Sequence, residues 1–180
     1  MEVYIGPYPD DHDEDREVRI KIHDYDVWSM DHTVAMIVLP MLKKLRQNQH
    51  GSPHVKDQDV PHLPKYQRAS NEDLQIDMFQ SDEQDELFWQ QIHDRWKWCL
   101  DEMIWAFEQL LDEDNEEQFW IVKPEIDFDD AFEDAGDGSG HKVLKWQRRG
   151  ELDYEALHRH QERIQNGLRL FGTYFTGLWD

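Results

Sequence analysis

Residues 95–117 read RWKWCLDEMIWAFEQLLDEDNEE, and this stretch places three tryptophans and a phenylalanine within thirteen residues, directly ahead of a run of carboxylates. Apolar residues recur here and just upstream in steps of three and four: Phe88, Ile92, Trp96, Cys99, Met103, Phe107 and Leu110. Such spacing puts them on one face of a helix. The SDEQ sequence at residues 81–84 has the pattern of a capping box. We therefore expect a helix of about thirty residues whose apolar stripe belongs to the core.

Two tryptophans of this stretch lie off the stripe. Trp98 follows Trp96 by two positions, about 200° around a helix, and Trp105 comes seven residues later on nearly the same side as Trp98. Both either pack under a second segment, for which the proline-rich residues 50–77 are the candidate, or form an open ligand surface. We favour packing, because exposed tryptophan pairs are uncommon in soluble proteins unless they bind something.

Two more amphipathic helices are expected. The first has one apolar face formed by Val34, Ile37, Val38, Met41, Leu42 and Leu45. The second starts at Asp153 and carries Leu157, Ile164, Leu168, Phe171, Phe175 and Leu178. Residues 18–23 alternate apolar and polar side chains, which predicts a half-buried strand with residues 3–5 as its partner. Residues 118–122 and 141–146 indicate two more strands.

These elements predict the fold class. A chain of 180 residues is normally one domain, and its 38% hydrophobic residues suffice for a core. We expect a single α+β domain over residues 1–180, with three main amphipathic helices forming most of the core and a small sheet of about four short strands. Acidic loops are expected at about residues 8–16, 50–80 and 123–140.

Charge narrows the range of partners. Forty acidic and nineteen basic residues give a net charge of −21, a field that repels nucleic acids and anionic membranes and attracts basic protein surfaces. We therefore expect no direct nucleic-acid binding and no membrane binding. The single cysteine, Cys99, excludes an internal disulfide, and the N-terminus lacks a signal-peptide pattern. These features predict a soluble intracellular protein.

Three spacings raise a metal hypothesis, and each is incomplete. EALH at residues 155–158 has the Glu-x-x-His spacing of di-iron bundles without a second copy. EQDE at residues 83–86 supplies half of the magnesium site of helical nucleotide pyrophosphatases. HGSPH at residues 50–54, with Asp57 and Asp59, offers two imidazoles and a carboxylate to zinc. A solvated helix face explains EALH, and a helix end followed by a proline-rich loop explains HGSPH, without a metal. We therefore expect no metal, no cofactor and no catalytic centre.

Four blocks of the sequence together carry a resemblance: YDVWSMDHTVAMIVLPMLKKLR, HGSPHVKDQDVP, RWKWCLDEMIWAFEQ and HQERIQNGLRLFGTYFTGLWD. In this order they resemble a family of uncharacterised proteins encoded by large tailed bacteriophages. The resemblance covers roughly the whole chain after Lys21, and residues 125–137 are where the chain departs most from it. It implies a phage source, and it implies no activity, fold or catalytic residue.

A phage source and the missing catalytic motifs favour an intracellular accessory protein that acts by binding, as a host-takeover or anti-defence inhibitor or as a sponge. Its partner would be a host protein with a basic surface or a small nucleotide-like ligand, in the cytoplasm of the infected cell. Stacking and charge would hold such a ligand through Trp28, His32, His50, Arg95, Trp98 and Trp105, with Arg148 and Arg149 also available. A virion or assembly component and a metal-dependent nucleotide hydrolase of helical type are the alternatives.

Overall fold

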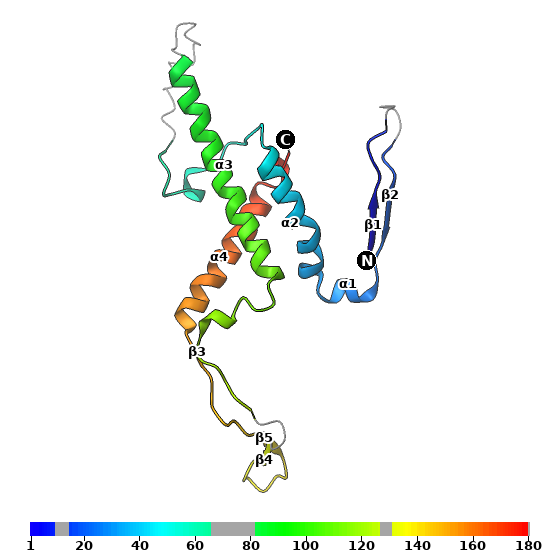
Figure 1. Ribbon diagram of the computed structural model, residues 1–180, viewed down its shortest axis with the longest axis vertical. Coiled ribbons are helices and arrows are strands. Elements are labelled where there is room, and N and C mark those ends of the chain that lie inside the picture. The colour runs from blue at the N-terminus through cyan, green and yellow to red at the C-terminus, as the bar shows by residue number, and fades with distance from the viewer. Residues whose placement is uncertain (10–14, 66–81, 127–130, 180) are drawn as a thin grey trace.

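Three long helices form the body of the protein, and short strands pair beside it (Figure 1). The computed structural model describes residues 1–9, 15–65, 82–126 and 131–179. The long helices are α2 (Met30–Asn48), α3 (Asp82–Leu111) and α4 (Tyr154–Thr173). The predicted α+β class and helical core are confirmed. Ser81, the first residue of the predicted capping box, lies outside the described part. Three segments of the predicted acidic loops also lie outside it: residues 10–14, 66–80 and 127–130.

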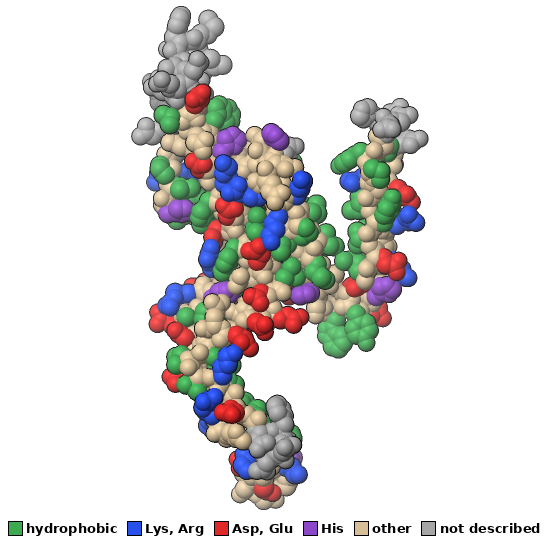
Figure 2. Space-filling view, in the orientation of Figure 1, with side chains coloured by type: hydrophobic (Ala, Val, Ile, Leu, Met, Phe, Trp, Pro, Cys, Tyr) green, Lys and Arg blue, Asp and Glu red, His purple; other side chains and the backbone are tan. Residues whose placement is uncertain are grey.

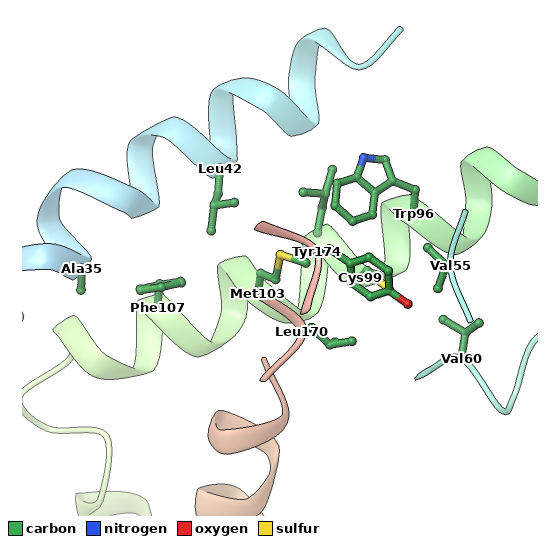
Figure 3. Close-up of a cluster of buried hydrophobic side chains, with 11 residues drawn as sticks. Ala35, Leu42, Val55, Val60, Trp96, Cys99, Met103, Phe107, Leu170 and Tyr174 are labelled. Carbon is green, nitrogen blue, oxygen red and sulfur yellow. The ribbon is translucent and has the colours of Figure 1, made fainter. Parts of the chain in front are cut away.

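Helix α3 is the centre of the core, since α2 and α4 both pack against it. It has the expected length, 30 residues, and the predicted stripe from Ile92 to Phe107 is buried. Phe88, at the start of the stripe, is 37% exposed. Figure 3 shows side chains of α2 and the 50–65 segment meeting this stripe. The buried cluster comprises Ala35, Leu42, Val55, Val60, Trp96, Cys99, Leu100, Met103, Phe107, Leu170 and Tyr174.

The predicted apolar face of α2 is only partly correct. Leu42 is buried, and Val38 and Leu45 are partly buried against the core. Ala35, which the predicted face did not include, is fully buried. Three other predicted face residues are exposed instead: Val34, Ile37 and Met41. The sequence places apolar side chains around more than half of this helix, so the contact with α3 decides which of them are covered.

Helix α4 begins where the sequence predicts. The Asp153 carboxylate accepts a hydrogen bond from the Ala156 backbone N–H at 2.9 Å, which is an N-cap. The helix ends at Thr173, so Phe175 lies beyond it in the short 3-10 helix η5 (Phe175–Gly177) and is 62% exposed. Gly167 is buried where α4 meets α3, because a Cβ there would collide with Ala106 and lie 2.7 Å from the Glu102 carbonyl oxygen.

The first two strands form a hairpin that stands apart from α2 (Figures 1 and 2). Strands β1 (Glu2–Ile5) and β2 (Val18–Lys21) pair antiparallel, so the predicted partnership is confirmed. The prediction of a half-buried strand is wrong, because all four residues of β2 are exposed. Alternation makes a strand amphipathic, but it does not supply an element to cover the apolar face.

The other four strands build one long arm rather than joining the hairpin in a sheet. Strand β3 (Trp120–Val122) pairs with β6 (Glu151–Leu152), and β4 (Phe132–Asp134) pairs with β5 (Lys142–Leu144) further out. An isolated bridge between Glu125 and Arg148 links the two pairs. The described strands therefore form three separate two-stranded ribbons, and part of the predicted acidic loop 123–140 is strand. Gly136, Gly138 and Gly140 all have positive φ at the tip, which glycine adopts without strain.

Candidate functional site

Arg95, predicted to hold a ligand, is 1% exposed and binds the chain itself. Its guanidinium donates to the Pro64 carbonyl oxygen at 2.8 Å and to the Asp57 carboxylate at 2.6 Å. It also donates to the Val55 carbonyl oxygen at 3.3 Å. These contacts fasten residues 55–64, including the 3-10 helix η1 (Asp57–Asp59), to the side of α3.

A second buried network, which the sequence did not reveal, surrounds Asp59. This carboxylate is 4% exposed, accepts from the Tyr174 hydroxyl at 2.6 Å and pairs with Arg169 at 2.8 Å. The Tyr174 oxygen accepts from the Lys56 backbone N–H at 2.9 Å. Burial, and then the bond to Asp59, raise the pKa of Tyr174. No local pattern could reveal this pairing, because more than a hundred residues separate the partners. Asp57 and Asp59, considered for zinc, are thus both paired with arginine.

Trp98 is packed, as predicted, and is half-buried at the edge of the core. Its ring lies against the ring of His62, with the two centroids 4.6 Å apart. His62 belongs to the proline-rich segment that was expected to cover this face, so the predicted cover is confirmed for Trp98.

Trp105 is also half-buried, but its cover comes from α4. The Arg163 guanidinium lies over the indole at 3.9 Å from the ring centroid, and the His160 ring packs edge-on at 5.2 Å between centroids. Arg163 also donates two hydrogen bonds, of 2.6 and 3.0 Å, to the buried Glu102 carboxylate. This bond to Glu102 raises the pKa of Arg163. The stack therefore fixes α4 onto α3.

The other three predicted ligand residues lie elsewhere. Trp28, at the end of α1 (Asp24–Trp28), is 82% exposed and stacks on Tyr25. His32 lies half-buried in the first turn of α2, and His50 is exposed just beyond the end of that helix. The 19 residues of α2 measure about 28 Å along the axis, so His50 lies at the opposite end of this helix from Trp28 and His32.

The Glu155/His158 pair is engaged in other contacts. Glu155 pairs with Arg159, and His158 lies 3.3 Å from Glu162 along an exposed face of α4. Among the described residues, no group of three or more His, Cys, Asp or Glu side chains lies close enough to hold a metal ion. Cys99 is buried at the centre of the core, and burial raises the pKa of its thiol to about 12, which suppresses its nucleophilicity.

The hairpin presents an exposed apolar face. Val3 lies opposite Ile20 and Ile5 lies opposite Val18, so these four side chains share one side of the ribbon, here called the hairpin face. Each is 42–59% exposed. The other side pairs Glu2 with Lys21 and Tyr4 with Arg19, whose guanidinium lies 4.7 Å from the Tyr4 ring centroid. Figure 2 shows the hydrophobic side turned toward α2 and the charged side turned away.

A second exposed apolar row runs along α2. Met30, Val34, Ile37 and Met41, here called the α2 stripe, are 61%, 42%, 37% and 66% exposed. Between the stripe and the hairpin lies α1, with Tyr25 80% exposed beside Trp28. The hairpin face, the α2 stripe and these two rings together form what is called the N-terminal apolar surface below.

The base of the hairpin is tied to α1. The Asp26 carboxylate binds the Met1 amino group at 2.9 Å and accepts from the His23 backbone N–H at 2.7 Å. The hydrogen bond from the amino group, followed by the one from His23, lowers the pKa of Asp26. The hairpin is thus fixed to α1, which leads directly into α2.

Within the described part of the chain, no helix is long and apolar enough to cross a membrane. Comparisons of the whole chain with models of protein families, with curated proteins and with solved structures find no match.

Proposed function

We propose that this chain is a non-catalytic binding protein of a large tailed bacteriophage and that it acts by protein–protein contact through the N-terminal apolar surface. One observation carries the proposal: the hairpin face and the α2 stripe expose eight aliphatic or methionine side chains beside two exposed aromatic rings. Monomeric proteins seldom leave an apolar patch larger than about 300–600 Å² in water, and larger patches mark interaction sites. Large aromatic side chains are also frequent anchors of protein interfaces.

The alternatives of a small ligand and of hydrolysis find less support. Arg95 is held by Asp57 and two carbonyl oxygens, and Trp105 lies under Arg163, so these groups stabilise the fold. Glu102, a buried carboxylate of α3, is paired with Arg163. A protein partner would instead contact the exposed side chains of the N-terminal apolar surface, which are available for binding.

The test compares the size-exclusion elution of variants at two methionines of α2, in extracts of infected cells. Met41 lies on the α2 stripe and is 66% exposed, whereas Met36 lies off it and is 52% exposed. Tagged wild-type protein should elute from size exclusion well above its chain mass of 21.8 kDa. Met41→Asp should lower that mass, because a carboxylate in an apolar contact is costly to desolvate, and Met36→Asp should leave it unchanged. Elution of the wild type at its chain mass would refute the proposal.

A virion or assembly component is a second candidate, favoured by the extended shape. The hairpin and the long arm both project from the helical body (Figure 1), and the arm exposes Ile121 and Phe132 at 62% and 61%. Two separate projections are suited to contacts with more than one neighbour. Mass spectrometry of purified virions tests this, and presence at stoichiometric copy number would favour it over a host-directed inhibitor.

A further inference from the structure

We draw no further inference here: the strongest candidate, the exposed apolar face that α2 shares with the β1–β2 hairpin, belongs to the surface already described, and nothing in the described part of the structure shows what covers it.

Discussion

Substituting alanine for Gly167 measures how closely α3 and α4 approach. A Cβ on Gly167 would collide with Ala106 and lie 2.7 Å from the Glu102 carbonyl oxygen, whereas ordinary contacts begin at 3.4 Å. The helices must therefore separate by at least about 0.7 Å, and gaps of this size forfeit a quarter to a half of each dispersion contact. Since a backbone atom is the obstacle, the overpacking cost should lie at the upper end of the usual range, about 2–3 kcal/mol.

Gly172→Ala is the matched control. It lies in the same helix, with no heavy atom within 4 Å of an added Cβ, so it gains helix propensity, up to about 1 kcal/mol, without a clash. In urea unfolding, Gly167→Ala should be about 2–3 kcal/mol less stable than Gly172→Ala. The corresponding difference in Tm is about 4–12 °C. Equal stability of the two variants would refute the close approach of the helices at Gly167.

Three further predictions concern the core. Trp96→Ala should cost about 3–5 kcal/mol and Trp98→Ala about 1–3 kcal/mol, because Trp96 is fully buried and Trp98 half-buried; wild-type stability of Trp98→Ala in urea would contradict its packing against His62. The Cys99 thiol should resist a disulfide reagent at pH 8 until the chain is unfolded, and rapid labelling of the native protein would show that it is accessible. Burial raises the pKa of Cys99 from 9.0 to about 12 and also raises that of Tyr174. Stability should therefore be complete below about pH 9 and fall as pH rises toward 12, since only the unfolded groups then ionise; a flat denaturant midpoint from pH 8 to 11 would contradict this.

Local patterns of the sequence determined the elements themselves. The 3.6-residue period from Ile92 to Phe107 predicted the position, length and buried stripe of α3, because helical hydrogen bonds join residues that are close in the chain. The alternation in residues 18–21 likewise predicted the hairpin with residues 3–5. The strand β4, which pairs with β5, was missed because the acidic and glycine residues around it resemble a loop.

Tertiary contacts alone decided what covers each face. On α2, apolar side chains lie around more than half of the helix, so the sequence could not say that Ala35 and Leu42 meet α3 while Val34 and Met41 stay exposed. The sequence could not assign the candidate ligand residues for the same reason. Arg95 pairs with Asp57, 38 positions away in the chain, and so stabilises the fold. A period describes one element, whereas burial requires a second element at the right distance and orientation. The N-terminal apolar surface is visible only in the folded chain, because only there do the hairpin face and the α2 stripe prove to be exposed.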